Sequence, residues 1–292
     1  MCELFGMSSA KPATINYSLK EFSAHGGLTH LNRSGWGIGY VEDHDVRLIK
    51  EAREMDRSPW VNFIAKRRIV SHTVIAHVRY ASVGARSLEN CHPFRQELGG
   101  RMHLFAHNGT LAKVATALPY EGPRYRPLGQ TDSEHAFCVL LQRLEALWHD
   151  TDTLPDLHKR ISIVSDFAAE LRRLGPANFL YTDGDALFAH AHRRVFDDSG
   201  VLSAPRPPGL NMLHLPHRPG GRRLDTAGLS VEMQEHGTTL VASVPLTDDD
   251  WVPLSEGTLV VIRDGQVVEP RPEPGGADAA GKAALIDSGR ES

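Results

Sequence analysis

Short apolar runs bounded by turn residues recur along the chain. Three of these runs are rich in β-branched or aromatic residues: 74–78 (VIAHV), 102–106 (MHLFA) and 259–263 (LVVIR). Runs of this length and composition are typical of buried β-strands. A weaker strand is expected at 36–41 (WGIGYV), because its glycines lower the strand propensity.

Asp-Gly pairs predict two β-hairpins. One pair lies in TDGD at 182–185, between the apolar segments 178–181 and 186–191. The second pair, at 264–265, follows the run 259–263 and precedes QVVE. Asp-Gly is favoured in tight hairpin turns because both residues tolerate the positive φ angles that such turns require.

Helical spacing in the middle of the chain predicts two long helices. The first begins at Thr131, and the side chains of Thr131 and Glu134 fit a capping box. Its apolar residues share one face: Phe137, Leu140, Leu141, Leu144 and Trp148. The second helix spans about 157–174 and is ended by Gly175-Pro176.

The order of these elements predicts the architecture. Many strands with helices grouped between them indicate two packed sheets flanked by helices, which is an α+β domain. Shorter helices are expected around 18–23 and 59–66, and the Pro-, Arg- and Gly-rich segment 199–224 predicts a long surface loop. Residues 2–268 are expected to form one domain, followed by a disordered tail at 269–292.

The charge balance narrows the classes of partner. Lys and Arg total 32 against 36 Asp and Glu, a formal net charge of −4, which argues against a general nucleic-acid or polybasic membrane binder. No run approaches the roughly 18 apolar residues of a membrane-spanning helix, and no signal peptide is visible. Three scattered cysteines are too few for a disulfide framework. We therefore expect a cytoplasmic protein that binds neither nucleic acid nor membranes.

Cys2 is the first candidate for chemistry, because it becomes the first residue if Met1 is removed. A terminal cysteine carries its own α-amine, with an ordinary pKa of roughly 7.7–8.0, and this amine can accept the thiol proton. The apolar residues that follow predict a strand that fixes the terminus inside the fold. The alternative is an incidental cysteine at the chain start.

Three further clusters place polar residues at the ends of predicted elements. Arg79 follows the strand 74–78 and could clamp a carboxylate, or form a structural salt bridge. Asn108 and Gly109 follow the strand 102–106 and could donate hydrogen bonds to an oxyanion, or form an ordinary Asn-Gly turn. Asp132 opens the long helix and could receive an ammonium group, or act only in capping.

Histidines near one another raise the question of a metal site. His190 and His192 share a face of their predicted strand, and His135 lies near Cys138 on the helix. Neither pair has a third ligand at an obvious spacing. We therefore expect no metal, and we expect Cys138 to be a core residue.

The combination MCELFG … HVRYAS … HPF … HNG … TDSE resembles the class II glutamine amidotransferases, whose domain belongs to the N-terminal nucleophile hydrolases. Three longer segments resemble the stand-alone, YafJ-type subgroup: GWGIGY at 35–40, NFLYTDGDALFAH at 178–190 and VPLTDDDWVPLSEGTLVVI at 244–262. The resemblance covers about residues 2–265. It implies a four-layer αββα sandwich, which agrees with the elements predicted above.

The resemblance also implies roles for individual residues. Cys2 corresponds to the nucleophile, with its α-amine as general base and acid, while Asn108 and Gly109 correspond to the oxyanion hole. Arg79 corresponds to the arginine that holds the substrate carboxylate. The remaining matches are Ser82, which assists the arginine, and Asp132, which receives the substrate ammonium. Three positions depart from the pattern of relatives and leave the details of the acyl-group pocket open: Ser34, Tyr80 and Val83.

The function implied is hydrolysis of the side-chain amide of glutamine, or of a γ-glutamyl amide, through a γ-glutamyl thioester. No metal or organic cofactor is required. We expect no synthase domain in this chain, so ammonia would pass to a separate synthase subunit, or the protein would hydrolyse a small metabolite as the similar ergothioneine-pathway amidohydrolases do. A third alternative is a non-catalytic module that binds γ-glutamyl compounds or amino acids.

Overall fold

The computed structural model describes most of the chain. The described residues are 2–17, 34–54, 58–67, 69–79, 84–121, 123–148, 153–198, 201–217, 219–220, 222–225, 229–233 and 237–270. The helix expected at 18–23 and nearly all of the expected tail lie outside these residues.

Strands from both ends of the chain form a nine-stranded antiparallel sheet, in which β1 is paired with β4 on one side and with β13 and β14 on the other. The central position of β1 follows from its long apolar pattern, because residues 3–8 are buried on both faces. The strands are β1 (Glu3–Tyr17), β2 (Trp36–Glu42), β3 (Asp45–Glu51), β4 (Val70–Val78), β11 (Asn211–Leu215), β12 (Arg222–Asp225), β13 (Leu229–Met233), β14 (Thr238–Ala242) and β15 (Val252–Pro253).

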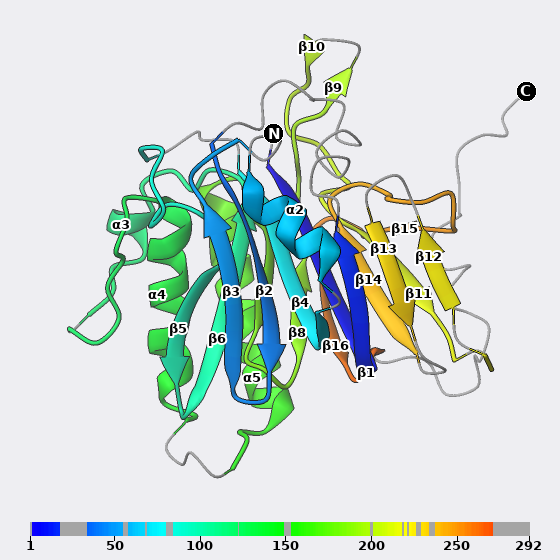
Figure 1. The fold of residues 1–292 in the computed structure, drawn as a ribbon. Helices are drawn as coiled ribbons and strands as arrows, with labels where there is room; N and C mark the ends of the chain where they lie inside the picture. Colours follow the sequence, from blue (N-terminus) through cyan, green and yellow to red (C-terminus); the bar gives the residue numbers. More distant parts are fainter. Residues whose placement is uncertain are drawn as a thin grey trace, which may run out of the picture.

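A second, six-stranded sheet has the order β17-β16-β8-β7-β6-β5. Its strands are β5 (Phe94–Leu98), β6 (Arg101–Asn108), β7 (Asn178–Thr182), β8 (Leu187–His190), β16 (Leu259–Arg263) and β17 (Gln266–Glu269). A short hairpin of β9 (Asp197–Asp198) and β10 (Val201–Leu202) projects beyond the sheets near the start of β1 (Figure 1).

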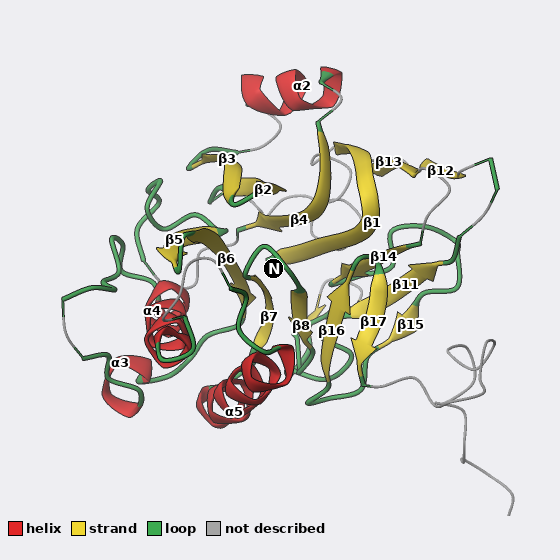
Figure 2. Ribbon diagram, turned by 90° about the horizontal axis from the view of Figure 1, so that it is seen from below, coloured by secondary structure: helices red, strands yellow, loops and turns green. Residues whose placement is uncertain are grey.

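The two sheets stack face to face between helices, so four layers are visible in Figure 2. The outer face of the six-stranded sheet is covered by α4 (Asp132–Glu145) and α5 (Leu157–Leu174), with the short α3 (Val114–Ala117) beside them. The outer face of the nine-stranded sheet carries α2 (Pro59–Lys66). This is the four-layer αββα arrangement expected from the sequence, and the expectation is confirmed.

Successive side chains of β1 pack alternately into two different apolar layers. Leu4 packs between the sheets with residues such as Leu104 and Leu180, whereas Phe5 and Met7 face the layer beneath α2. A third cluster joins α4 and α5 to the six-stranded sheet. The period of two along β1 therefore points every even-numbered residue near the chain start toward the second sheet.

Most predicted elements are confirmed at or close to their expected bounds. The helices at 59–66 and 157–174 and the strand at 259–263 have the bounds that the sequence predicts. Both Asp-Gly hairpins are present, and Asp264 and Gly265 have φ angles of 50° and 72°.

The prediction of a long surface loop at 199–224 is wrong in part, because the segment contains strand β11. Within it, β11 pairs with β14 along five residues, and Leu213 and Leu215 are buried under the nine-stranded sheet. The segment NMLHL alternates apolar and polar residues, but the Pro and Gly around it obscured the pattern.

The capping box at the start of α4 is half confirmed. The Thr131 side chain accepts a hydrogen bond from the Glu134 N–H, as expected. The Glu134 carboxylate instead accepts from the N–H groups of Leu128 and Gly129 at 3.1 and 2.7 Å, so it holds the preceding loop. No helix among the described residues is long and apolar enough to cross a bilayer.

Candidate active site

The ends of several central elements meet at one edge of the two sheets. Because β1 and β4 are antiparallel and Glu3 is opposite Val78, Cys2 and Arg79 lie at the same end of the sheet. The C-terminal end of β6 reaches this edge from the second sheet, because Asn108 contacts Cys2.

Asn108 connects the candidate nucleophile to the nine-stranded sheet. Its Nδ2 donates to the carbonyl oxygen of Cys2 at 2.9 Å and to Ser243 Oγ at 3.2 Å. Ser243 Oγ in turn accepts from the N–H of Leu4 at 2.9 Å. An amide donor is thus held beside a partly exposed cysteine at the start of a buried strand.

The orientation of the Asn108 amide is determined by its partners. The Cys2 carbonyl can only accept, so the amide NH₂ group must face it, and Oδ1 must face His77. His77 Nε2 lies 2.9 Å from that oxygen and therefore carries the proton. Burial lowers the pKa of His77 to about 3, so the ring stays neutral at neutral pH.

Gly109 is required by a close backbone approach. Its φ angle is 147°, and a Cβ atom here would lie only 1.7 Å from the carbonyl oxygen of Pro176. The same carbonyl accepts from His107 Nε2 at 3.1 Å. The Asn108–Gly109 peptide is therefore held in one position by the segment that precedes β7.

Arg79 is buried, and its guanidinium holds the loop that follows β4. Its two terminal nitrogens donate to the carbonyl oxygens of Ala85 and Gly84 at 3.2 and 3.3 Å. The backbone of Arg79 is also paired, because its N–H donates to the Gly35 carbonyl at 2.8 Å. A fully paired backbone and a buried stem leave the guanidinium little freedom of position.

Asn90 joins the Arg79 loop to the loop before α4. Its Nδ2 lies 3.0 Å from the Ala85 carbonyl and 3.0 Å from Gln130 Oε1, and its Oδ1 accepts from the Gln130 N–H at 2.9 Å. Asn90 is completely buried. Its hydrogen bonds link Arg79 to the start of α4, where Asp132 lies.

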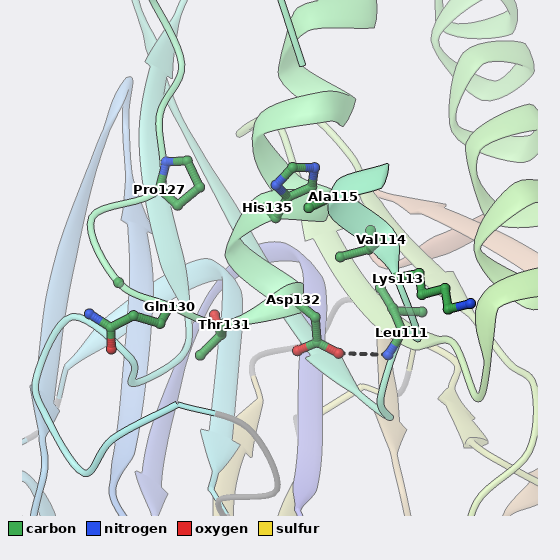
Figure 3. Close-up of a pocket in the computed structure, with 10 residues that line it drawn as sticks. Leu111, Lys113, Val114, Ala115, Pro127, Gln130, Thr131, Asp132 and His135 are labelled. Atoms are coloured by element: carbon green, nitrogen blue, oxygen red, sulfur yellow. Dashed lines mark hydrogen bonds between the residues drawn. The ribbon is translucent and has the colours of Figure 1, made fainter. Parts of the chain in front are cut away.

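Asp132 points back toward the segment that follows Gly109. One carboxylate oxygen accepts from the Leu111 N–H at 2.6 Å, as Figure 3 shows, and the other accepts from the Ser133 N–H at 2.9 Å. Ser133 Oγ lies 2.9 Å from His107 Nδ1. Two contacts thus join the acidic end of α4 to the Asn108–Gly109 segment.

A pocket of about 340 Å³ opens beside Asp132, between the loop before α4 and the segment around α3 (Figure 3). Its lining consists of Leu111, Lys113, Val114, Ala115, Pro127, Gly129, Gln130, Thr131, Asp132 and His135. Asp132 is the acidic member of the lining, so the pocket adjoins the place expected for a substrate ammonium.

The three cysteines differ in their capacity to react. Burial raises the pKa of Cys91, whose Sγ lies 3.3 Å from the carbonyl oxygens of Glu51 and Ser87. Burial also raises the pKa of Cys138 to about 12, in agreement with the expected core position. Neither thiol ionises readily near neutral pH, whereas Cys2 is partly exposed.

The structure gives the local setting of two of the candidate clusters. Asn108-Gly109 does not close a hairpin, because β6 pairs with β5 and β7 and not with the segment that follows it. Thr131 caps α4, and Asp132 adds the contact to Leu111. Three sequence positions singled out above lie outside the described residues: Tyr80, Ser82 and Val83.

Sequence reasoning missed the residues that hold the site together. His77 and Asn90 lie inside or beside the recognised motifs, but their hydrogen bonds to Asn108 and Gln130 cross between elements. Ser243 had no local signal, because it reaches the site only through the pairing of β14 with β1. Among the described residues, no group of three His, Cys, Asp or Glu side chains could hold a metal ion.

Comparison with known proteins assigns a family to this arrangement. The sequence profile of the glutamine amidotransferases class-II matches residues 1–283. The chain belongs to this family.

Two relatives match long parts of the chain. An uncharacterized protein of Methanocaldococcus jannaschii, MJ1515, is 32% identical over 277 residues, which cover 92% of this chain and 71% of the relative. A protein of Escherichia coli K12 with the name "Putative glutamine amidotransferase YafJ" is 38% identical over 191 residues, which cover 65% of this chain and 72% of YafJ.

Solved structures support the same fold. A crystal structure of a predicted glutamine amidotransferase from Pseudomonas aeruginosa is 31% identical, covers 91% of this chain and 99% of its own, and has a TM-score of 0.65. Glutamine phosphoribosylpyrophosphate amidotransferase from Bacillus subtilis has a TM-score of 0.51 at 16% identity, covering 91% of this chain and 48% of its own. The second likeness is one of fold.

Proposed function

We propose that this protein hydrolyses the side-chain amide of glutamine, or of a γ-glutamyl amide, with Cys2 as the nucleophile. The observation that carries the proposal is the hydrogen bond from Asn108 Nδ2 to the Cys2 carbonyl. It keeps an amide donor beside a partly exposed thiol, in a chain whose other two thiols are buried with raised pKa values. Membership of the family supports glutamine as the substrate class.

In this mechanism the Cys2 thiol transfers its proton to its own α-amine, which is free once Met1 has been removed. The thiolate sulfur forms a bond to the amide carbon, and the carbonyl electron pair moves to oxygen. Asn108 Nδ2 and the Gly109 N–H stabilise this oxyanion, so one present acceptor of the Asn108 amide gives way to it. The alignment of the Asn108 amide by His77 supports this role, because the donor needs no reorientation.

Two later steps complete the turnover. The α-ammonium returns a proton to the leaving nitrogen as the C–N bond breaks, which releases ammonia or an amine and leaves a γ-glutamyl thioester. A water molecule then attacks the thioester carbon, and the sulfur leaves as the thiol, so glutamate is released and Cys2 is regenerated. The ammonia either enters solution or passes to a separate synthase subunit.

The amino-acid end of the substrate requires partners of both charges. We assign the α-carboxylate to Arg79, assisted by Ser82, because a buried guanidinium with a fixed stem suits a carboxylate. We assign the α-ammonium to Asp132, which adjoins the pocket at the start of α4. Two observations support these assignments: Arg79 follows the end of β4 that pairs with the start of β1, and Asp132 accepts from Leu111 in the segment that follows Gly109.

The test is release of ammonia or amine from glutamine and from a panel of small γ-glutamyl amides. We expect turnover by the native protein, none by Cys2→Ala, and retained turnover by Cys138→Ala, which removes a buried thiol of α4 as the matched control. Intact mass spectrometry of the native protein is expected to show that Met1 is absent.

Each outcome of this assay selects among the alternatives. Turnover of glutamine supports ammonia release, and turnover of one γ-glutamyl amine alone supports a hydrolase of a specific metabolite. If the native protein and Cys2→Ala are equally inert on every compound, the catalytic proposal is wrong. Binding of glutamate by such an inert protein would then indicate a non-catalytic module.

A further inference from the structure

A buried ion pair lies directly beside the candidate nucleophile. Glu3 follows Cys2, is 1% exposed, and accepts two hydrogen bonds from the guanidinium of Arg194, at 2.8 Å and 3.3 Å. Arg194 comes from the segment after β8, which belongs to the opposite sheet, and lies 191 residues further along the chain. The pair therefore joins the first residue of β1 to the segment that follows β8.

Arg194 also binds Ser243, the residue whose hydroxyl accepts a hydrogen bond from the Asn108 amide. Its Nη1 donates to the Ser243 carbonyl at 2.6 Å. The hydroxyl of that same serine accepts from Asn108 Nδ2 and from the Leu4 N–H. One guanidinium thus contacts both the residue after Cys2 and the serine beside the proposed oxyanion donor.

Main-chain pairing on the β14 side stops one residue short of Glu3. On the β14 side the regular register ends at Phe5 opposite Ala242, and the Leu4 carbonyl then accepts from the Ser243 N–H at 3.0 Å. Glu3 lies beyond that ladder, and on the other side it is the last residue paired with β4. Beyond Leu4, the chain start is connected to the β14 side through the Glu3 side chain, because Arg194 binds both this carboxylate and the Ser243 carbonyl.

We propose that Glu3 and Arg194 form a positioning pair that sets the place of Cys2 relative to the Asn108 amide. The inference rests on the proposed function and names residues that act on the nucleophile without touching substrate. Replacing a buried ion pair with apolar residues is often neutral or stabilising, so stability alone gives no reason for such a pair here. Two parallel hydrogen bonds from a planar guanidinium fix a carboxylate in direction as well as in distance.

The main chain of Arg194 is held independently of Glu3. Its N–H and carbonyl are both paired with Arg206, at 2.9 and 2.8 Å, and both guanidinium groups lie over the ring of Phe196. A change of the Arg194 side chain should therefore leave the segment in place. Arg206 provides the matched control, because it shares this ring but pairs with the exposed Asp198 and not with Glu3.

The experiment compares Arg194→Lys and Glu3→Gln with Arg206→Lys in steady-state hydrolysis of glutamine. We expect kcat to fall by about 10–100-fold in the first two variants, since small displacements of reacting groups carry penalties of this size. The affinity for glutamate, measured by calorimetry, should stay within about twofold, because Arg79 and Asp132 are untouched. Arg206→Lys is expected to keep the native kcat.

A second measurement reports on the position of the Asn108 amide and does not require turnover. The side-chain amide signal of Asn108 in a ¹⁵N NMR spectrum, identified by its loss in Asn108→Ala, should shift in Arg194→Lys and stay unchanged in Arg206→Lys. The double variant Glu3→Gln/Arg194→Gln removes both charges and should show the same loss of kcat if a single variant does not fold.

The outcomes separate this inference from the proposed function. An inert native protein overturns the proposed function, while the amide signal still tests the position of Asn108. Native turnover with unchanged kcat and an unshifted amide signal in folded Arg194→Lys and Glu3→Gln overturns the positioning role alone. A lowered melting temperature with native kcat would likewise show a purely structural pair.

Discussion

At the scale of single residues, the orientation of one amide determines what the site can stabilise. Asn108 can turn either its NH₂ group or its oxygen toward Cys2, and only the NH₂ group can stabilise an oxyanion. The neutral ring of His77 selects the productive orientation by donating to Oδ1. His77 is therefore a positioning residue in the proposed mechanism.

This role predicts a difference between two substitutions of His77. A glutamine can present an N–H near the position of Nε2, whereas a leucine leaves Asn108 Oδ1 without its donor. We expect His77→Leu to lower kcat toward the loss of Asn108→Ala, about 10²–10³-fold, with little change in KM. We expect His77→Gln to recover much of that loss.

The measurement is steady-state hydrolysis of glutamine, with circular dichroism to show that each variant is folded. A folded His77→Leu protein with native kcat would contradict the orienting role. Equal losses in both variants would point to the volume of the ring and not to its N–H group.

At the scale of elements, the junction after β6 depends on a single residue without a side chain. Gly109 approaches the Pro176 carbonyl so closely that no Cβ fits, and its φ angle is 147°. Gly220 has a positive φ angle of 86° as well, but a Cβ atom there would meet none of the described residues within 4 Å. Substitution of Gly220 by alanine therefore measures the cost of the backbone conformation alone. The same substitution at Gly109 adds the cost of the steric clash with the Pro176 carbonyl.

We expect Gly220→Ala to lower the free energy of unfolding by about 1 kcal/mol, the cost of a left-handed conformation. Gly109→Ala should lower it by roughly 3 kcal/mol or more, since β6 and the segment before β7 must also move apart. Urea unfolding of both variants measures the difference. Similar losses in the two proteins would show that the Pro176 contact is easily relieved.

The sequence predicted correctly those helices and strands whose formation depends on residues close together in the chain. The helix α5 has an amphipathic face, an Asp156 cap and a Gly-Pro end, so its bounds could be derived from the sequence. The strand β11 was missed because its burial depends on its pairing with β14, which begins 23 residues after β11 ends. Strand pairing adds information that no single segment contains.

In the candidate active site, too, residues in short motifs could be predicted, whereas contacts between distant segments could not. Cys2 and Asn108 could be found because they sit in short motifs at the ends of predicted strands. The contacts that give them their geometry, such as Glu3 with Arg194 and Asn108 with Ser243, join residues more than 130 positions apart. Such contacts follow from the packing of two sheets and not from local spacing.

At the scale of the whole molecule, buried histidines make the fold sensitive to acid. Burial lowers the pKa of His77 to about 3 and the pKa values of His103 and His190 to about 4. These rings stay neutral in the folded protein, while the unfolded chain binds protons with pKa values near 6.5. Stability is therefore complete above about pH 6.5 and is lost as the pH falls toward the folded-state values.

The size of the effect can be predicted from linkage. At about pH 5.5 each such histidine removes roughly 1–2 kcal/mol, so three together remove about 4 kcal/mol of the free energy of unfolding. We expect a clear fall in melting temperature between about pH 7.5 and pH 5.5, measured by calorimetry. A flat profile over this interval would contradict the burial of neutral rings.

The pairing of β1 with β14 has a consequence for the order of events during synthesis. These strands are joined at Phe5 and Ala242, so the ribosome must add more than 230 residues before the first strand gains this neighbour. At about 5–20 residues per second, this takes roughly 12–50 seconds. Throughout that interval the first strand lacks its neighbour at Phe5. If Met1 is removed, as the proposed mechanism requires, the late synthesis of β14 leaves this time for the cleavage before the start of β1 gains its second neighbour.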